Sequence, residues 1–315
     1  RGVLLNIEPI FVNYEKFSPK GFLKQSSIIK KLENKVDLFF YPHINLPLYV
    51  PKNTITTIHD LIPLTKFWDR NELKRKIFIF YLKRALKKSK SIITISKTVA
   101  SELKERFNLD RKEINVIYRF IDDKFYCNDK QIKPMLKEKY ILFVGNRKKH
   151  KNLSNFIFAF SKIKNKSDIK LVITGSKEKQ KNDVDILIEN LNLKKHVIEF
   201  ISPSDEDIMS LYKYAKLFVF PSLFEGFGLP PLEALALGCP VIASNIPVLK
   251  EILGDEIACF DPYDVDDMAN KIYKAITDDY YREHLLTIGK ERLKFFDKNE
   301  IIDELIHYIK NVIKG

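Results

Sequence analysis

Short apolar runs alternate with amphipathic segments along the second half of the chain, and this alternation constrains the fold more than any other feature. Apolar runs predict buried strands at Tyr140–Gly145, Lys170–Gly175, Val197–Phe200, Leu217–Phe220, Val241–Ser244 and Ile257–Phe260. Apolar residues spaced three and four apart predict helices at Leu153–Ile163, Asp205–Ala215, Leu232–Leu237 and Val265–Ile276. Strands that alternate with helices form a parallel sheet covered on both faces. We therefore predict a doubly wound α/β domain.

The first half carries a weaker version of the same pattern. It predicts strands at Asp37–Phe40, Thr54–Ile58, Ser91–Ile95 and Ile114–Ile117, and helices at Glu72–Lys88 and Thr98–Phe107. The chain has 315 residues, about twice a typical domain. The polar, proline-containing stretch Cys127–Lys139 interrupts the periodicity. We predict an α/β protein of two Rossmann-like domains, residues 1–135 and 136–290, with a helix over residues 291–315 that packs back across both.

Composition narrows the function classes. Hydrophobic residues make up 45% of the chain, too many for a disordered protein. No apolar stretch approaches the roughly 20 residues that span a bilayer, and there is no signal peptide, so we expect any membrane contact to be peripheral. A net charge of +13 favours phosphate-bearing partners such as nucleotides, nucleic acid or anionic lipid, but also fits a solvated lysine-rich surface. We expect no nucleic-acid binding, because a recognition helix and an aromatic-basic stacking pattern are lacking.

The cysteines and histidines predict neither disulfides nor a metal centre. Cys127, Cys239 and Cys259 lack the number and spacing of a disulfide framework or a zinc site, which favours a reducing, cytosolic setting. Cys239 and Cys259 stand in apolar runs and are expected to be small buried residues rather than reactive thiols. The histidines show no metal-like spacing, so we predict no catalytic metal.

The densest chemical signal is FPSLFEGFGLPPLEALALGCPVIAS, Phe220–Ser244. A strand ends here, Gly226 and Gly228 follow, and two prolines open a helix. Backbone amides of a glycine-rich turn and a helix N-terminus bind phosphate. Glu225 and Glu233 flank the turn, where carboxylates can accept hydrogen bonds from sugar hydroxyls. The same residues also suit an ordinary strand-to-helix turn, in which Glu233 only favours the helix dipole.

Two further segments with candidate functional residues lie at the carboxyl ends of predicted strands. In GNRKKHKNL, Gly145–Leu153, basic side chains create a positive field in which Arg147 and Lys151 can neutralise a leaving diphosphate. Lys148 and Lys149 are expected to be solvated surface. In TTIHDLIP, Thr56–Pro63, His59 can hydrogen-bond a sugar hydroxyl, although a lone histidine there is more often structural.

Together these segments resemble glycosyltransferase family 4, the retaining sugar-nucleotide transferases of GT-B fold, in which two Rossmann-like domains face a cleft. The resemblance runs from DLFFYPHINLPLYVP (Asp37–Pro51) to FDPYDVDDMANKI (Phe260–Ile272) and is most specific in Phe220–Ser244. The mannosyltransferase-like branch is similar at TIHDLIP, TISK, VGNRKKHKN and PSLFEGFGLPPLEA. The resemblance implies an N-terminal acceptor-side domain and a C-terminal domain that binds the nucleotide sugar.

The resemblance also implies residue roles. Glu225 would contact the transferred sugar, His59 the sugar near the reacting centre, and Glu233 the ribose. Arg147 and Lys151 would hold the diphosphate. The remaining donor-binding positions are Gly145, Ile201, Ser202, Gly226, Phe227, Gly228 and Leu229.

The implied activity is transfer of a hexose, with mannose as the first choice, from a GDP- or UDP-linked sugar to a glycan or lipid-linked saccharide in surface polysaccharide synthesis. No cofactor other than this donor is expected. The implied location is cytoplasmic, at the inner face of the cell membrane, with contact to its anionic surface.

Two departures from the family keep other interpretations open. A strand and glycine-rich loop expected before Asp37 are missing, so the N-terminal domain is predicted to be incomplete. The polar-Gly pair that usually follows the strand near Val116 is here YRFID, Tyr118–Asp122, so Arg119 occupies an unusual place. The alternatives are a truncated, non-catalytic remnant that binds nucleotide sugar, and a GT-B sugar-nucleotide epimerase or phosphorylase.

Overall fold

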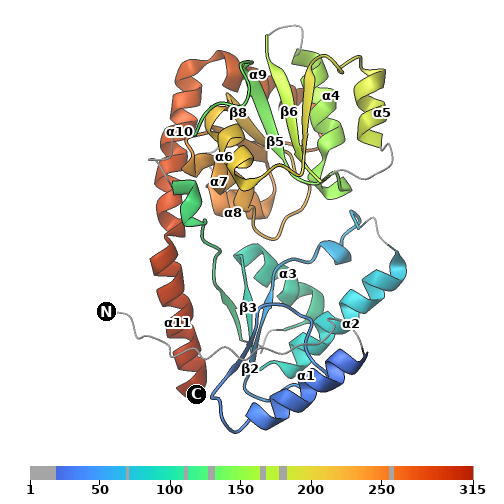
Figure 1. The fold of residues 1–315 in the computed structure, drawn as a ribbon, viewed down its shortest axis with the longest axis vertical. Helices are drawn as coiled ribbons and strands as arrows, with labels where there is room; N and C mark the ends of the chain where they lie inside the picture. The colour runs from blue at the N-terminus through green and yellow to red at the C-terminus, as the bar shows by residue number, and fades with distance from the viewer. Residues whose placement is uncertain are drawn as a thin grey trace.

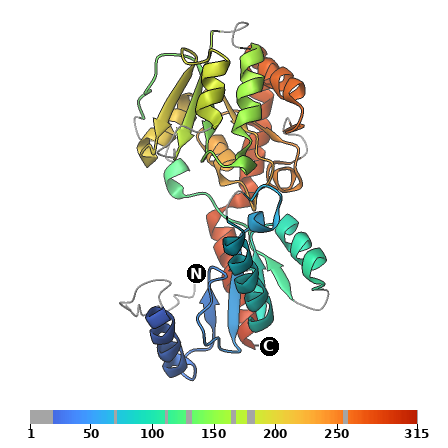
Figure 2. The ribbon, with the colours of Figure 1, turned by 90° about the vertical axis from the view of Figure 1, so that its right-hand side faces the viewer.

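The computed structural model describes residues 19–68, 71–109, 113–126, 132–163, 168–176, 183–254 and 259–314. These residues form two α/β domains stacked along the long axis of the molecule (Figure 1). The C-terminal helices run along one side and join the two domains. Figure 2 shows the same stacking after a quarter turn. Cys127 lies outside the described residues, and so do residues 1–18 of the stretch before Asp37 where we predicted that a strand and loop are missing.

The N-terminal domain is built on a parallel sheet of order β1-β2-β3-β4 within the described residues. Its elements are α1 (Pro19–Leu32), β1 (Phe39–Tyr41), β2 (Thr54–Ile58), α2 (Glu72–Lys88), β3 (Ser91–Thr94), α3 (Lys97–Phe107) and β4 (Ile114–Val116). One face packs on α2 and α3, where Ile58 and Ile92 meet Leu82 and Leu103. The sheet is therefore covered on this face as the apolar pattern requires.

The C-terminal domain carries a larger parallel sheet of order β10-β9-β8-β5-β6-β7 among the described residues. Its strands are β5 (Tyr140–Val144), β6 (Lys170–Gly175), β7 (Val197–Ile201), β8 (Leu217–Phe220), β9 (Val241–Ser244) and β10 (Cys259–Phe260). Its helices are α4 (Leu153–Ile163), α5 (Asp183–Asn190), α6 (Asp205–Tyr214), α7 (Leu229–Ala236), α8 (Pro247–Leu253), α9 (Val265–Thr277) and α10 (Asp279–Leu293). The strand order reverses between β5 and β8, and in open α/β sheets ligands bind at such a reversal.

The predicted α/β class and the parallel sheets are confirmed. Helices α1, α5 and α8 were not predicted, which is a shortcoming of the sequence interpretation. Helices α5 and α8 have 8 and 7 residues, too short for a clear apolar period. In α1, lysines and serines dilute the apolar face. The predicted strand Ile257–Phe260 is described only at Cys259–Phe260. Cys239 is fully buried, as expected, and Cys259 is partly buried.

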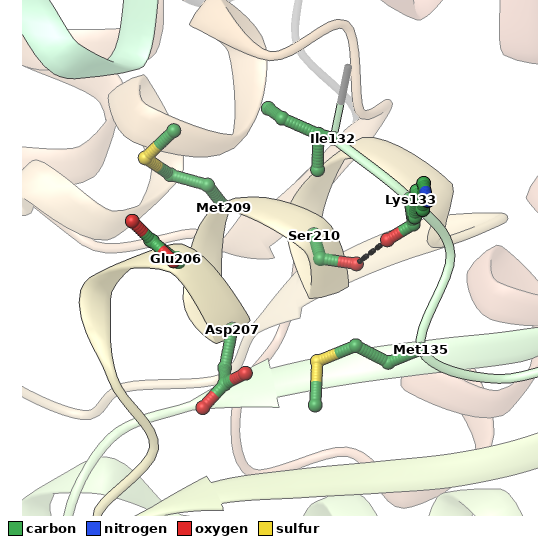
Figure 3. Close-up of a pocket in the computed structure, with 7 residues that line it drawn as sticks. All are labelled: Ile132, Lys133, Met135, Glu206, Asp207, Met209 and Ser210. Carbon is green, nitrogen blue, oxygen red and sulfur yellow. Dashed lines mark hydrogen bonds between the residues drawn. The ribbon is translucent and has the colours of Figure 1, made fainter. Parts of the chain in front are cut away.

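The chain passes between the domains twice. After β4, the linker is held to α6, because Ser210 Oγ donates to Lys133 O at 2.7 Å and Tyr214 OH to Ile132 O at 2.6 Å. A hollow of about 390 Å³ remains beside this linker, with the Ser210 contact on its wall (Figure 3). After α10, helix α11 (Lys298–Lys314) returns to the N-terminal domain, where Lys90 Nζ donates to Val312 O at 2.7 Å.

Helix α11 covers the second face of the N-terminal sheet. Tyr308 and Val312 belong to the same apolar cluster as Ile55 and Ile93, and the hydroxyls of Tyr308 and Ser91 are hydrogen-bonded. This cluster continues into the C-terminal domain through residues such as Phe220. The two domains therefore share buried apolar surface.

Candidate active site

Lys151 and Glu225 meet at the strand-order reversal of the C-terminal sheet. Their loops follow β5 and β8, the adjacent strands from which the chain proceeds in opposite directions. Lys151 Nζ lies 2.6 Å from Glu225 Oε1, and the two side chains are 14% and 10% exposed. A nearly buried ion pair at this position places one cation and one carboxylate where a ligand of this fold class is expected.

Backbone contacts join the two loops that carry this pair. Leu223 N donates to His150 O at 2.7 Å, next to Lys151. The Lys151 ammonium also lies over the Phe220 ring, 5.2 Å from its centroid. The carboxylate of Glu225 and the ring of Phe220 thus hold the Lys151 ammonium, so its charge has a defined position, unlike that of a mobile surface lysine.

The turn into α7 offers backbone N–H groups beside Glu225. Gly228 is the N-cap with φ 107°, a conformation that favours glycine, and Leu229, Pro230 and Pro231 are the first residues of the helix. Because proline has no N–H, the amides that can reach an anion are those of residues 226–229. The Phe227 ring is buried and packs 6.0 Å from the Tyr118 ring, so only the backbone of this residue faces a ligand.

His59, at the end of β2, approaches this turn from the N-terminal domain. A Cβ atom added to Gly226 would lie 2.1 Å from His59 O, so only glycine allows the two backbones to come this close. His59 Nε2 lies 2.7 Å from Pro42 O. Since a carbonyl only accepts, Nε2 carries the proton, and Nδ1 remains as the nitrogen that can accept from a hydroxyl.

Asp60 is a member of the site that the sequence interpretation did not single out. Burial raises the pKa of its carboxyl, and the nearby negative charge of Glu225 raises it further, while a hydrogen bond from Ile62 N opposes the shift. A carboxyl with a raised pKa, next to a second carboxylate, is typical of functional sites. The sequence signal that could have identified Asp60 was its position directly after His59.

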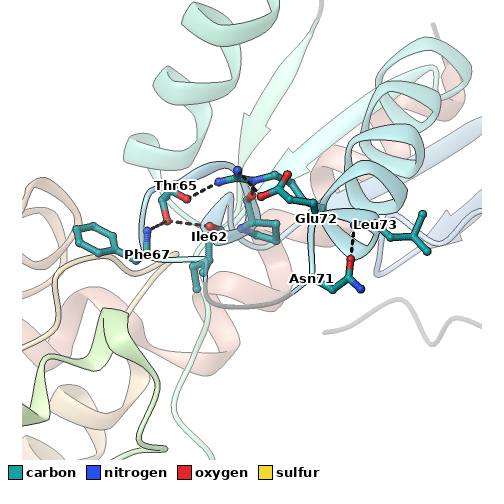
Figure 4. A network of polar contacts seen from close by, with 8 residues as sticks. Ile62, Thr65, Phe67, Asn71, Glu72 and Leu73 are labelled. Carbon is teal, nitrogen blue, oxygen red and sulfur yellow. Dashed lines mark hydrogen bonds and ion pairs between the residues drawn. The ribbon is translucent and has the colours of Figure 1, made fainter. Parts of the chain in front are cut away.

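An arginine from α2 orders the loop that follows His59 and Asp60. Arg75 donates to Pro63 O at 2.9 Å and to Thr65 O at 2.8 Å, and it pairs with Glu72 at 3.0 Å. Thr65 in turn donates to Ile62 O at 2.8 Å and accepts from Phe67 N at 3.2 Å (Figure 4). The loop is therefore fixed by its own hydrogen bonds, which sets the direction of the chain beyond His59.

Arg147 has partners other than those the sequence predicts. Its guanidinium donates to Asp185 Oδ1 at 2.7 Å and also to Glu199 Oε1, and the side chain is 6% exposed. Within the described residues no contact joins it to Lys151 or Glu225. Its predicted contact with a diphosphate stays a prediction, and it requires these ion pairs to open.

Glu233 has a hydrogen-bond partner on α6, and its predicted contact with the ribose stays a prediction. It accepts from Tyr212 OH at 3.3 Å on α6. Burial raises the pKa of its carboxyl, while the hydroxyl of Tyr212 and the positive charges of Lys124 and Arg119 lower it. Arg119, the unusual residue of the sequence, is thus placed where its charge acts on Glu233.

The remaining predicted donor residues lie along the carboxyl ends of β5, β6 and β7. Gly145 N donates to Thr174 O at 3.0 Å, and Ser202 N donates to Gly175 O at 3.1 Å. Ser202 has φ 48°, in the left-handed region. Ile201 is 49% exposed, so an apolar side chain is presented at this sheet edge, as a planar base would require. In the part of the chain described, no His, Cys, Asp and Glu side chains form a group that could hold a metal ion.

Comparison with known families identifies the chain. The family model described as "Glycosyl transferases group 1" matches residues 127–292. This chain belongs to the group 1 glycosyl transferases. A second model, "Glycosyltransferase Family 4", matches residues 5–125, which confirms the resemblance drawn from the motifs.

Other members are similar over most of this chain. The O-antigen chain mannosyltransferase RfbU of Salmonella typhimurium is 32% identical over 75% of this chain and 64% of its own length. The serotype-specific mannosyltransferase WbdA of Escherichia coli is 32% identical over 74% of this chain. The chain spans 30% of the length of WbdA, so it matches these relatives only in part.

Solved structures share the GT-B fold. Sucrose-phosphate synthase from Thermosynechococcus elongatus has a TM-score of 0.76 at 20% identity, covering 94% of this chain and 79% of that one. Anabaena HepE, solved in complex with UDP and glucose, has a TM-score of 0.76 at 16% identity, covering 94% of this chain and 84% of that one. The predicted fold of two Rossmann-like domains facing a cleft is thereby confirmed.

Proposed function

We propose that this chain transfers a hexose, with mannose as first choice, from a nucleotide-diphosphate sugar to a glycan or lipid-linked saccharide acceptor. The observation that carries the proposal is the Lys151–Glu225 contact at 2.6 Å, at the strand-order reversal and beside the turn of residues 226–229. The cation and the backbone amides suit the diphosphate of such a donor, and the carboxylate suits its sugar hydroxyls.

The site suits the departure of a diphosphate. When the glycosyl–phosphate bond breaks, negative charge grows on the leaving oxygen, and preorganised donors there lower the barrier. Lys151 and the amides of residues 226–229 supply them, and Glu225 accepts hydrogen bonds from sugar hydroxyls. The donor nucleotide is GDP or UDP, and no metal or cofactor is needed for these contacts.

The anomeric configuration of the sugar is retained if the acceptor attacks on the same face of the sugar from which the diphosphate departs. The acceptor hydroxyl oxygen forms the new bond to the anomeric carbon, the bond from that carbon to the phosphate oxygen breaks, and the hydroxyl proton passes to the leaving phosphate. No protein nucleophile takes part. His59 contributes by accepting a hydrogen bond from a sugar hydroxyl at Nδ1, the nitrogen not engaged with Pro42 O.

The activities of the relatives support mannose as the sugar and a surface polysaccharide as the product. RfbU and WbdA are named as mannosyltransferases, and RfbU as acting on the O-antigen chain. By analogy, the acceptor of this chain is a growing surface glycan or its lipid-linked precursor, assembled at the cytoplasmic face of the membrane.

A thermal-shift panel tests donor binding, and a labelled donor tests the reaction. GDP, UDP and their hexose derivatives are added singly, and a true ligand raises the melting temperature by mass action. The labelled donor then separates the alternatives. A transferase moves label into a glycan, an epimerase returns an isomeric donor, a phosphorylase requires inorganic phosphate, and a non-catalytic remnant binds without turnover. Binding without any glycan product would contradict the proposal.

We further propose that α2 provides a peripheral contact with an anionic membrane. Leu73, Ile77 and Phe80 share its outward side and are 62%, 47% and 62% exposed. Exposed Lys76, Lys83 and other lysines flank them. An apolar stripe bordered by cations suits an interface with acidic head groups. Among the described helices, none has the length and apolar character needed to cross a bilayer.

Vesicle sedimentation tests this contact. Binding to phosphatidylglycerol vesicles should exceed binding to phosphatidylcholine vesicles, and Phe80→Ser should reduce it. Phe158→Ser, at a 41% exposed site on α4, is the matched control. Equal loss in both variants, or equal binding to both lipids, would count against α2 as the contact.

A further inference from the structure

A serine of the N-terminal domain holds the glycine turn of the C-terminal domain. Ser96 Oγ donates to Gly226 O at 2.8 Å, across 130 positions of sequence. The same oxygen accepts from Val99 N at 3.2 Å and so caps α3. Ser96 is completely buried. One hydroxyl therefore uses both its donor and its acceptor capacity to join the start of α3 to the turn beside Glu225.

A carboxylate of the C-terminal domain completes the contact at the same helix end. Glu251, on α8, accepts from Lys97 N at 2.6 Å through Oε1. Its Oε2 accepts from Thr98 N at 2.9 Å and from Thr98 Oγ at 2.7 Å. The first amides of a helix lack intrahelical partners, and the helix dipole favours an anion there. The carboxylate thus supplies acceptors that α3 does not have within its own domain.

Neighbouring groups hold Glu251 and the turn in place. Burial, and then the charge of Glu251 and a hydrogen bond to it, raise the pKa of Tyr118 to about 12, so Tyr118 stays protonated as a donor. The Tyr118 ring packs against Phe227 at 6.0 Å. Arg292 Nε donates to Ile252 O at 2.7 Å, which fixes the chain next to Glu251.

We propose that Ser96, Thr98, Gly226 and Glu251 form a cross-domain clasp that positions the turn of residues 226–229 to bind the donor. The clasp exists only while the domains are in contact, so separating them releases the Gly226 carbonyl and the turn loses its support. Domain approach and donor affinity are then coupled, each favouring the other by the same factor. The inference rests on the proposed function, since it takes this turn as the donor site.

The test compares Ser96→Ala and Glu251→Gln with two matched controls. Asp278→Ala also removes a helix cap, an acceptor for Tyr281 N at 2.9 Å, but within one domain. Glu291→Gln makes the same carboxylate-to-amide change on an exposed residue paired with Lys294. Two quantities are measured for each variant: the radius of gyration by small-angle scattering, and the dissociation constants of GDP and UDP by calorimetry.

We expect both clasp variants to expand the molecule and to weaken binding of the preferred nucleotide by about fivefold or more, the lower end of measured site couplings. The controls should leave both quantities unchanged. In transfer assays KM for the donor should rise more than kcat falls, because the clasp acts on binding. A double variant should be less than additive, since either change opens the same contact.

Unchanged scattering and unchanged nucleotide affinity in Glu251→Gln would overturn the clasp. A loss of affinity equal to that of Asp278→Ala would do so as well, because it would then reflect only general destabilisation. If the unaltered protein binds neither GDP nor UDP, the proposed function fails, whereas the scattering comparison still decides whether the clasp holds the domains together.

Discussion

Lys151 Nζ lies 2.6 Å from Glu225 Oε1, although 74 positions separate the two residues in the chain. The strand order of the C-terminal sheet explains why the two residues meet. Strands β5 and β8 are neighbours, so the loops that follow them begin side by side at the same edge of the sheet. The contact therefore places an ammonium and a carboxylate side by side where a sugar diphosphate would need both.

Lys151→Met should weaken binding of the nucleoside diphosphate and reduce turnover. Loss of a preorganised charge at a leaving group lowers rates by roughly 100-fold or more. Calorimetry with GDP and UDP and a transfer assay measure the two effects. The control is Lys294→Met, whose partner Glu291 is also 2.6 Å away but whose ion pair is largely exposed. Comparable losses in both variants would mean that the charge acts non-specifically.

Arg147→Met should destabilise the fold before it affects chemistry. It removes the guanidinium that pairs with Asp185, 12% exposed, and Glu199, 26% exposed, and should lower the free energy of unfolding by about 3 kcal/mol, the lower end of what breaking a buried ion pair costs. Chemical denaturation measures it. Arg106→Met, which breaks a more exposed pair with Glu102 at 3.7 Å, should cost much less. An unchanged unfolding midpoint in Arg147→Met would contradict the structural role assigned to these ion pairs.

Much of the fold follows from local pattern. Helix α4 was predicted at Leu153–Ile163 and is found there, because its apolar residues recur at helical spacing and are buried on one face. Strands β6, β8 and β9 have the predicted bounds for the same reason, since short apolar runs between turns are characteristic of buried parallel strands.

The site was only partly predictable. Lys151, Glu225, His59 and the glycine turn were singled out because each lies in the loop that follows an apolar strand. The partners of Arg147 were not predicted, since Asp185 and Glu199 lie 38 and 52 positions away and their approach depends on how α5 and β7 pack. The contact of Ser96 with Gly226 joins two domains. Hydrophobic periodicity predicts local elements and cannot predict a contact between residues 130 positions apart.

Asp60→Asn should stabilise the protein at neutral pH. The folded-state pKa of Asp60 is raised, mainly by burial, so the folded state favours the protonated form. Stability of the unaltered protein therefore falls as the pH rises from the ordinary pKa, about 4, through the raised value. Asparagine keeps the acceptor for Ile62 N and has no charge to bury.

Denaturation of both proteins at a series of pH values checks this expectation. The advantage of Asp60→Asn should be largest at neutral pH and should shrink toward pH values near about 4, where Asp60 is also protonated. Asp37→Asn, at an exposed position of the same domain, serves as the control. A constant difference across the whole series would refute the raised pKa.

Gly226→Ala should reduce catalytic efficiency by about 100-fold, because displacing a binding turn by about 1 Å has effects of that size. Its new Cβ would meet His59 O at 2.1 Å and push the domains apart. Gly238→Ala is the control, since a Cβ there has no atom within 4 Å and the cost is backbone strain at φ 77° alone. Steady-state kinetics distinguish them, and equal kcat/KM in the two variants would show that the close approach is unimportant.

The most direct test of the account is the rate at which labelled hexose passes from nucleotide sugar to acceptor in the unaltered protein and in Glu225→Gln. The account predicts that this variant still folds and binds nucleoside diphosphate, with a melting temperature lowered by the loss of the nearly buried pair with Lys151, but transfers sugar roughly 100-fold more slowly. Transfer at the rate of the unaltered protein would contradict it, because the carboxylate beside Lys151 would then have no part in the reaction.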